Sequence, residues 1–459
     1  MKFNDRKKRT SSLVEMSKEN LPKAVLFLAW PIIVEMLLQS SVGIADTAMV
    51  GRLSPASIAA VGLGNQIIML LLTVFAAVRT GATVLVARLI GAGEFEEAND
   101  AARQALIITI IFGLAVALFG VIFPEVGYRL LGAEEEVILV GASYMRYRAI
   151  AALFACITMV VTGILQGCGD TLTAMKVNVT LNLLNIIFNY LLIFGRFGFP
   201  EMGTAGAGAA TMIARMVGAA MMLAVLFRGK GDIRLRVKDG FKLSKDVLKR
   251  LLNVGIPAGI EQGLMRGAQL FFTMVVTNLG TVMYAAHQIV LRADSVAFMP
   301  GFGFATAATA LVGQNLGAKQ PKEAEKAAHI TMLMAIGLMS FVGVFLFFFA
   351  TPIMKFFTND PEVIAAGISP MRIISFSMPF MAIERVSAGA LRGAGDTKYV
   401  MFGTGISIWI ARLGLAYVLV NYFDMGLVGA WIGMFADHIV RAAFFFTRFK
   451  KGQWKFIRL

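Results

Sequence analysis

GILQGCGDT at Gly163–Thr171 is matched 226 residues later by GALRGAGDT at Gly389–Thr397. After a shift of three residues the correspondence continues, from Gly206-Ala207 to Gly429-Ala430. Matches at one offset over about 140 residues indicate an internal duplication, which has to be recognised before any other feature of a fold. Other identical residues at the offset of 226 are Pro31 and Pro257, Glu35 and Glu261, Val86 and Val312, Gly91-Ala92 and Gly317-Ala318, and Met145-Arg146 and Met371-Arg372.

The sequence around these stretches is too apolar for a soluble protein. Of 459 residues, 58% are hydrophobic and 15% are charged, whereas soluble domains are about 45–50% apolar and about 25% charged. Continuous apolar runs of about 20 residues recur along the chain, the length that a helix needs to cross a bilayer core of ~30 Å. Two cysteines, Cys156 and Cys168, give no disulfide framework. We therefore predict an all-α integral membrane protein.

Twelve transmembrane helices are predicted from these runs, starting near positions 24, 57, 98, 137, 172, 204, 248, 283, 326, 363, 398 and 427. Each copy of the repeat holds six, so both enter the membrane from the same side as a parallel repeat. Two pseudo-symmetric six-helix bundles are expected. The predicted parts are a cytoplasmic N-terminal tail (1–23), an N-lobe (24–228), a cytoplasmic linker (229–247), a C-lobe (248–447) and a cytoplasmic C-terminal tail (448–459).

The distribution of positive charge predicts the orientation in the membrane. Of 43 lysines and arginines, 29 fall in the two tails and the even-numbered loops, and the odd-numbered loops hold only four: Arg52, Arg129, Arg196 and Lys355. The positive-inside rule then places both termini in the cytoplasm of a cell whose inner (plasma) membrane the chain crosses. The net charge of +15 follows from the same bias and indicates no nucleic-acid partner.

No motif of a catalytic site is found in the sequence. A Walker-type phosphate loop, a metalloprotease motif and a nucleophile elbow are missing, and three histidines with two cysteines form no ligand cluster at metal spacing. We predict no enzyme and no cofactor. Two similar bundles with a cleft between them, one rocking against the other, are typical of secondary transporters. The expected partners are small organic substrates and membrane lipids, and a monomer is expected.

Ionisable residues inside spans are the strongest pointers to function, because each costs about 2.5–3.5 kcal/mol at the bilayer centre. The candidates are Glu35, Asp46, Glu261, Asp294, Glu384 and Asp437. Asp46 has Phe272 as its repeat partner, so this acid has no counterpart in the second half. A packing role tends to recur in both copies, whereas ion coupling need not. Asp46 is therefore a candidate coupling site, the alternative being a water-exposed acid near the outer end of its helix.

Four asparagines lie in the fifth predicted span: Asn178, Asn182, Asn185 and Asn189. Asn185 and Asn189 are four residues apart and lie on one helix face, which Asn182 roughly shares. These amides can coordinate a cation or hydrogen-bond to Asp46. The alternative is that they join helices as polar contacts.

Two glutamates occupy equivalent places in the repeat, because Glu35 and Glu261 each follow a proline by four residues. They serve either symmetric packing or the lining of a central cavity. Glu384 is next to Arg385 and forms either a local ion pair or an attractive site for cationic substrates. The three histidines are expected at helix surfaces or interfaces rather than as ligands: His287, His329 and His438.

Several motifs resemble those of the multidrug and toxic compound extrusion family, over about residues 20–445. They are Pro31 followed by DTAMVGRL at 46–53, the paired L-x-G-x-G-D-T turns at 165–171 and 391–397, VGQNLGA at 312–318, and NIIFN at 185–189 followed by LLIFG at 191–195. The resemblance implies twelve helices in two lobes. It also implies alternating-access export of organic, often cationic, compounds in exchange for H⁺ or Na⁺.

The resemblance also implies a cation-coupling site in the N-lobe. Asp46 matches the first-helix aspartate of the family, Asn185 and Asn189 match the fifth-helix pair, and Thr211 matches the sixth-helix threonine. With Asn182 added, these residues form the predicted coupling site. The ion is H⁺, or Na⁺ held at Asp46, Asn185 and Asn189.

Two departures from the family pattern bear on the coupling ion. Some members carry an aspartate where Asn189 stands. Members that use a pair of acids in the C-lobe place one of them, a glutamate, about where Met265 falls. Glu261 and Glu384 of this chain do not align with that pair of acids. The chain is therefore closer to the branch that relies on the N-lobe site. The predicted substrate cavity includes Glu35, Glu261, Met265 and Glu384.

Two alternative functions stay open. A flippase of lipid-linked precursors would need a basic cavity, for which the candidates are Arg266, Arg292, Arg385 and Arg412. A membrane-embedded enzyme or receptor would need a constellation of catalytic groups.

Overall fold

The computed structural model describes residues 13–229, 233–235 and 244–457. Within these ranges the chain forms helices joined by short turns, with no β-strand. Parts of the predicted N-terminal tail (1–12), linker (230–232 and 236–243) and C-terminal tail (458–459) lie outside the described residues.

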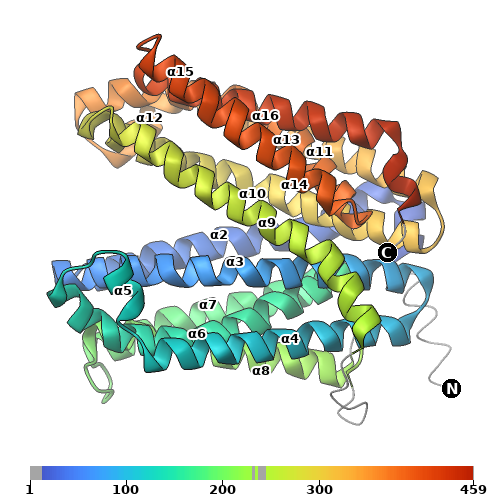
Figure 1. Ribbon diagram of the computed structural model, residues 1–459, viewed down its shortest axis with the longest axis horizontal. Helices are drawn as coiled ribbons and strands as arrows, with labels where there is room; N and C mark the ends of the chain where they lie inside the picture. The colour runs from blue at the N-terminus through green and yellow to red at the C-terminus, as the bar shows by residue number, and fades with distance from the viewer. Residues whose placement is uncertain (1–12, 230–232, 236–243, 458–459) are drawn as a thin grey trace. The chain divides into compact units, whose positions relative to one another are not determined.

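Every predicted span coincides with a long helical segment (Figure 1). In the N-terminal half these are α2 (Leu21–Val50), α3 (Pro55–Ala92), α4 (Phe95–Ile122), α6 (Glu135–Cys168), α7 (Thr171–Phe194) and α8 (Gly203–Arg228). In the C-terminal half they are α9 (Lys245–Thr277), α10 (Thr281–Gly317), α11 (Pro321–Phe348), α13 (Pro361–Gly393), the run α14 (Thr397–Ile406), η2 (Ser407–Gly414) and α15 (Leu415–Asn421), and α16 (Gly426–Lys451). Short helices complete the set: α5 (Val126–Leu130), α12 (Ala350–Phe357) and η3 (Gln453–Phe456).

Eleven of these segments are long and apolar enough to cross a membrane, within the described ranges. The remaining one, α9, has 33 residues and is long enough, but Glu261, Gln262 and Arg266 interrupt its apolar run. The all-α membrane fold is therefore confirmed, and the count of twelve helices is consistent with it.

Contacts divide the chain into two compact units. Unit 1 comprises Met1–Ile33, Gly91–Gly93 and Ile260–Leu459, and unit 2 comprises Val34–Ile90 and Glu94–Gly259. Apart from the short stretch Gly91–Gly93, the chain passes between the units within α2 and within α9, in each case two residues after a proline. All side chains compared below lie within one unit or the other.

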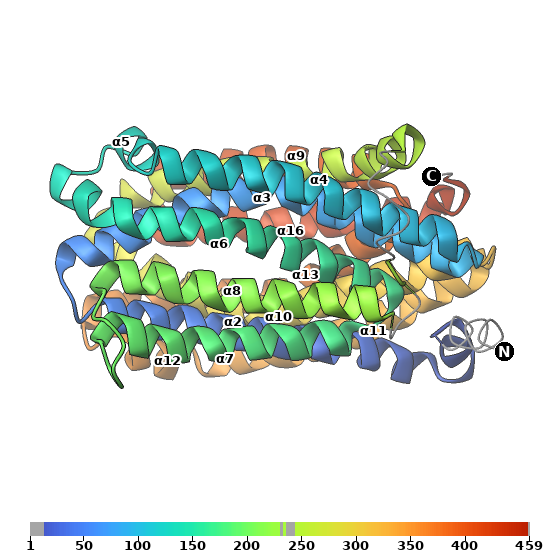
Figure 2. The ribbon, with the colours of Figure 1, turned by 90° about the horizontal axis from the view of Figure 1, so that it is seen from below.

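Unit 2 is organised around α6 and α8. These helices lie side by side, with α7 beside α8 (Figure 2), and α4 packs on α6. Small residues permit this proximity: a Cβ at Gly208 of α8 would contact the carbonyl oxygen of Tyr144 on α6, and one at Gly218 would contact Leu181 on α7. Close approach through small residues is the common way for membrane helices to associate.

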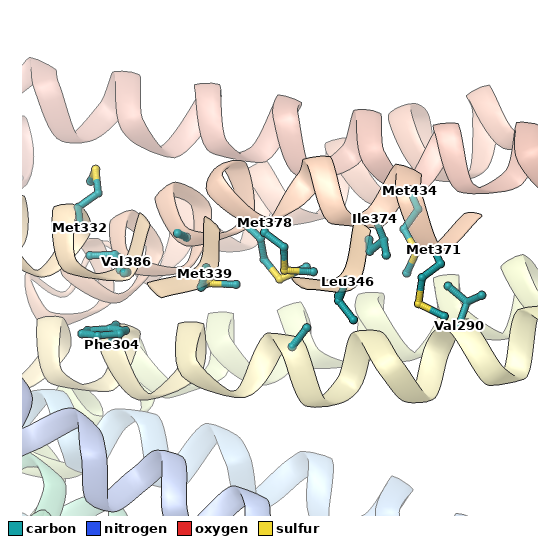
Figure 3. Close-up of a cluster of buried hydrophobic side chains, with 14 of the residues drawn as sticks. Val290, Phe304, Met332, Met339, Leu346, Met371, Ile374, Met378, Val386 and Met434 are labelled. Carbon is teal, nitrogen blue, oxygen red and sulfur yellow. The ribbon is translucent and has the colours of Figure 1, made fainter. Parts of the chain in front are cut away.

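Unit 1 is organised around α10 and α13, which pack on each other and on α11, while α16 packs on α13. Its core is rich in methionine (Figure 3), whose flexible side chain fills irregular gaps between helices. The buried methionines of this cluster include Met332, Met339, Met371, Met378 and Met434.

The repeated stretch, 163–171 in the first half and 389–397 in the second, takes part in a helix crossing in each half. Oγ1 of Thr83 on α3 donates to the carbonyl oxygen of Gly163 on α6 at 2.9 Å. The equivalent hydroxyl, from Thr309 on α10, donates to the carbonyl oxygen of Gly389 on α13 at 2.8 Å. The duplication read from the sequence is thus present as a duplicated contact.

The glycines one turn later, Gly167 and Gly393, lie at the same crossings and allow the two helices to come close. A Cβ at Gly167 would collide with the backbone of Thr83, and a Cβ at Gly393 would collide with the backbone of Thr309. Backbone atoms cannot move aside as a side chain can, so both positions require glycine.

Replacement of either crossing glycine is expected to destabilise the protein. Gly167→Ala and Gly393→Ala each force two helices apart, at a cost of about 1–3 kcal/mol, and the purified protein in detergent should unfold at a lower temperature. Gly337→Ala on α11, where a Cβ meets nothing within 4 Å, is the matched control and should leave the Tm unchanged or slightly raised. Equal Tm values for all three variants would contradict the crossing.

Candidate functional site

The first candidate site is a chain of polar side chains from α2, α7 and α8 in unit 2. Nδ2 of Asn189 donates to Oδ1 of Asp46 at 2.5 Å. The same nitrogen lies 3.4 Å from Oδ1 of Asn185, whose Nδ2 donates to Oγ1 of Thr211 at 3.3 Å. The hydroxyl of Thr211 donates to the carbonyl oxygen of Ala207 at 2.9 Å. Four of the five residues predicted for cation coupling therefore lie together.

Local sequence explains this arrangement. Asn185 and Asn189 are one turn apart on α7 and present their amides to the same neighbours. The start of α8 comes close to the end of α7 because Gly206 carries no side chain, and a Cβ there would meet the backbone of Leu192. The amides of α7 are thereby placed within reach of both α2 and α8.

The site is rich in oxygen ligands. Asn189 is 1% exposed, and its Oδ1 has no hydrogen-bond partner in the described part of the chain. With the carboxylate of Asp46 and the hydroxyl of Thr211, this oxygen is of the hard type that binds protons or alkali cations. In unit 1 the repeat counterpart of Asp46 is Phe272, which is fully buried among apolar side chains.

A second carboxylate of α2 is held in the same way. Nδ2 of Asn178 donates to Oε1 of Glu35 at 2.8 Å and lies 3.3 Å from Oγ1 of Thr162 on α6. Glu35–Asn178 and Asp46–Asn189 are both separated by 143 positions in sequence. Glu35 and Asp46 are about three helical turns apart, roughly 16 Å. The two carboxylates therefore face asparagines of α7 along one line.

A cavity of about 170 Å³ adjoins Glu35. Its wall includes Asn182, the fifth residue predicted for coupling, and two guanidinium groups, those of Arg79 and Arg215. Nη2 of Arg79 donates to Oε1 of Gln166 at 3.0 Å. Oε2 of Glu35 is buried without a hydrogen-bond partner among the described residues. Glu35, predicted to line a substrate cavity, does line a cavity, within unit 2.

The equivalent glutamate in unit 1 is closed off by an ion pair. Glu261 accepts from Oγ1 of Thr404 at 3.2 Å, again 143 positions apart, and from Nη2 of Arg392 at 2.6 Å. Arg392 stands where the first copy has Gln166. These contacts favour a packing role for Glu261 over the lining of a substrate cavity. Met265 lies one turn further along α9 and is partly buried.

Glu384 on α13 belongs to a network of buried charges. It is 2% exposed, and its Oε1 accepts from Nη1 of Arg441 at 2.8 Å. Its Oε2 lies 2.7 Å from Nδ1 of His438, and Arg385 is 3.6 Å away. These contacts support ion pairing by Glu384 rather than an open site for cationic substrates. Its nearer partners, Arg441 and His438, come from α16, and the adjacent Arg385 is farther away.

Asp437 on α16 extends this network. Its Oδ2 accepts from Arg441 and from Arg412, each at 2.6 Å, and its Oδ1 accepts from the hydroxyl of Ser407 at 2.7 Å. Arg412 and Ser407 belong to η2, a π-helical segment whose wider turn directs both toward α16. Sequence reasoning named Glu384 and Asp437 as candidates but missed the network that joins them. The spacing of Asp437 and Arg441 by one helical turn is a local signal of it.

Two of the three histidines lie at buried interfaces between helices. His438 is 2% exposed and contacts Glu384, and His287 is fully buried, with its ring against those of Phe272 and Trp431. A carboxylate meets the ring of His438, whereas both ring nitrogens of His287 are buried without a hydrogen-bond partner among the described residues. His329 is exposed, as expected.

Removal of the arginine shared by both carboxylates is expected to destabilise unit 1. Arg441→Gln leaves Asp437 and Glu384 short of a counter-charge in a water-poor interior, and breaking such a buried pair costs about 3–5 kcal/mol. Thermal unfolding in detergent measures the loss. Arg266→Gln, at an exposed arginine of α9, is the control and should keep the wild-type Tm. A wild-type Tm for Arg441→Gln would show that the network contributes little.

These features define a class of protein: a polytopic helical membrane protein with ionisable groups inside each half, which is typical of a transporter. Among the described residues, no group of three or more histidine, cysteine, aspartate or glutamate side chains is arranged to hold a metal ion.

Comparison with known proteins identifies the family. The family model MatE matches residues 31–191 and 257–418, two segments that start 226 residues apart, as the internal repeat does. The chain therefore belongs to the MatE family of multidrug and toxic compound extrusion transporters, which its motifs resemble.

The similarity to individual relatives extends over nearly the whole chain. The "Probable multidrug resistance protein NorM" of Thermotoga maritima is 34% identical over 450 residues, which are 96% of this chain and 95% of that protein. The "Uncharacterized transporter YisQ" of Bacillus subtilis is 28% identical over 428 residues, 93% and 94% of the two chains. A solved structure, the "Outward-facing conformation of a multidrug resistance MATE family transporter of the MOP superfamily", has a TM-score of 0.88 at 26% identity and covers 97% of this chain and 99% of its own.

Proposed function

We propose that the protein is a multidrug efflux antiporter that exports organic, often cationic, compounds in exchange for H⁺ or Na⁺ by alternating access. Family membership and the name of the Thermotoga maritima relative, a probable multidrug resistance protein, support export of drugs. The contact between Asp46 and Asn189 supports ion coupling, since an amide N–H holds a carboxylate at a position where the other half has Phe272. The proposal includes a multi-pass protein of the inner membrane with both termini in the cytoplasm, without a cofactor.

In the proposed exchange, the coupling ion and a cationic substrate compete for the negative charge of Asp46. A bound H⁺ or Na⁺ neutralises Asp46 and changes what Asn189 accepts or donates, whereas a cationic substrate is attracted to the free carboxylate. A ligand shifts a conformational equilibrium only if it binds the two states with different affinity. The ion and the substrate would therefore favour opposite openings of the transporter.

The ligand set of the site favours H⁺ over Na⁺ as the coupling ion. The site offers a single carboxylate, Asp46, which accepts a hydrogen bond from Asn189. A proton is bound covalently to one carboxylate oxygen and needs no further ligand, whereas a sodium ion needs several oxygen ligands at once.

The flippase alternative receives no support from the arginines on which it depended. Arg385 and Arg412 contact Glu384 and Asp437, so their charges are neutralised. Arg266 and Arg292 are exposed on α9 and α10.

The role of Asp46 is tested by removal of its charge. Asp46→Asn keeps the size of the side chain and its hydrogen bonding, so the protein should fold, but gradient-driven efflux of a cationic dye from cells should fall by at least about tenfold. Asp424→Asn, the same change at an exposed loop residue, is the control and should export normally. Full export by Asp46→Asn would reject Asp46 as the coupling residue.

The coupling ion is identified in proteoliposomes that carry one gradient at a time. A pH gradient alone should drive dye transport, and a sodium gradient at equal pH on both sides should not. Transport driven by sodium alone would replace H⁺ by Na⁺ in the proposal, and transport with neither gradient would exclude ion coupling.

A further inference from the structure

Unit 1 contains an apolar cavity of about 270 Å³ between α11 and α13. Its wall consists of residues at helical spacing on both helices, namely Ser340, Gly343, Val344, Phe347 and Phe348 of α11 and Ser375, Phe376 and Pro379 of α13. The residues from α11 extend over about two turns, roughly 12 Å along the helix. The side chains of Val344, Phe348 and Phe376 are exposed, so the cavity opens on an apolar surface of the protein. In a membrane-spanning segment such a surface contacts lipid.

The cavity is a consequence of one small residue. The two helices come close at Gly343, where a Cβ would lie 2.6 Å from the carbonyl oxygen of Ser375. Because Gly343 has no side chain, a hollow remains between the larger side chains of its neighbours. The hydroxyl of Ser375 donates to the carbonyl oxygen of Met371 in its own helix at 2.7 Å. This polar group is therefore satisfied without a ligand.

A guanidinium group lies at one end of the cavity. Arg372 comes one turn before Phe376 on α13, and its Cζ is 5.4 Å from the centroid of the Phe347 ring, within cation–π distance. Phe347 in turn packs edge-on against Phe376, with ring centroids 5.3 Å apart. Both rings line the cavity. The two aromatic side chains therefore connect the charge of Arg372 to the apolar wall.

This arginine lacks an anionic partner among the residues that the structure describes. Its side chain is exposed, and the contact with Phe347 is the interaction that the structure gives it. By contrast, Arg392 and Arg441 of the same unit contact Glu261 and Glu384. A charge in the hydrocarbon core is costly unless its side chain reaches the interface or an opposite charge.

The length of α13 indicates the depth of Arg372 in a bilayer. The helix has 33 residues, about 50 Å, which exceeds a hydrocarbon core of ~30 Å by about 20 Å. When the helix is centred in the membrane, about 10 Å extends beyond the core at each end. Arg372 comes eleven residues after Pro361, about 16 Å, and thus starts about 6 Å inside the core. A long side chain at this depth reaches the level of lipid headgroups.

The repeat distinguishes this arrangement from a general feature of the fold. Arg146 is the counterpart of Arg372 at the offset of 226 and is also exposed. At the same offset Phe347 corresponds to Val121, and Phe376 corresponds to Ile150. The arginine is thus present in both copies, whereas the pair of aromatic side chains beside it is present in unit 1.

We infer that the cavity between α11 and α13 binds an anionic phospholipid, with an acyl chain against Gly343 and Val344 and the phosphate on Arg372. The planar fork of N–H donors of a guanidinium matches phosphate oxygens, and the Phe347 ring holds this fork at the mouth of the cavity. An apolar hollow and a cation at its headgroup end fit the two parts of one lipid molecule. The inference depends on the membrane fold and not on the proposed export.

Photo-crosslinking to the full-length protein in detergent tests the inference. The probe is a phosphatidylglycerol with a diazirine in its acyl chain, and labelled positions are mapped by peptide mass spectrometry. Labels should lie within 340–348 and 375–379. Unlabelled phosphatidylglycerol should compete about tenfold more strongly than phosphatidylcholine with the same acyl chains, since phosphatidylcholine has no net charge for Arg372 to attract.

Two pairs of variants separate the headgroup contact from the acyl-chain contact. Arg372→Gln should make the two lipids equal competitors, whereas Arg146→Gln, the same change at the repeat counterpart, should keep the difference. Val344→Trp fills the cavity and should remove labelling from both segments with an unchanged Tm. Phe341→Trp, at an exposed residue of α11 outside the cavity wall, should be labelled like the wild type.

Equal competition by both lipids in the wild type would overturn the inference, as would a retained preference in Arg372→Gln or full labelling of Val344→Trp. A wild-type dimer that Val344→Trp dissociates, with no label in the cavity, would assign this surface to a second copy of the chain and likewise overturn it. Cross-linking is measured without a gradient or a transported compound, so these results are independent of the proposed export.

Discussion

Charge has to be neutralised away from water in this protein, and the two halves of the chain meet that constraint differently. In the C-terminal half, arginines of α13, α16 and η2 contact the carboxylates of Glu261, Glu384 and Asp437 directly. In the N-terminal half, amides of α7 hold Glu35 and Asp46, and no arginine among the described residues contacts either within 4 Å. An amide stabilises a carboxylate without cancelling its charge. The carboxylates of the N-terminal half therefore keep a negative charge that no contacting arginine neutralises, as the proposed coupling role of Asp46 requires.

Much of the architecture could be predicted from the sequence because it depends on properties that repeat along the chain. The length of the apolar runs gave the twelve helices, and one constant offset gave the duplication. The grouping of Asn185, Asn189 and Thr211 around Asp46 came from helical spacing together with family motifs. Each of these inferences uses neighbours one turn apart or a pattern that occurs twice.

The remainder depends on contacts between helices, which spacing along one helix does not show. His438 directly follows Asp437 in sequence, yet its ring contacts Glu384, 54 positions away. Asn182 shares a face with the other asparagines but lines the cavity beside Glu35. The π-helical turn at η2, which brings Arg412 to Asp437, has no signal in composition. The cavity beside Glu35 is lined by side chains of several helices, which no single stretch of sequence brings together.

The glycine crossings have an evolutionary consequence. Gly163 and Gly167 lie where α3 and α6 meet, and the contact of Gly167 with the backbone of Thr83 leaves no room for a side chain there. Thr158, about one turn earlier on α6, takes no part in that crossing. Mutation at Thr158 can therefore change the lining of the cavity beside Glu35 while the crossing of α3 and α6 stays intact. Selectivity among descendants of such an ancestor can diversify rapidly, with the architecture inherited unchanged.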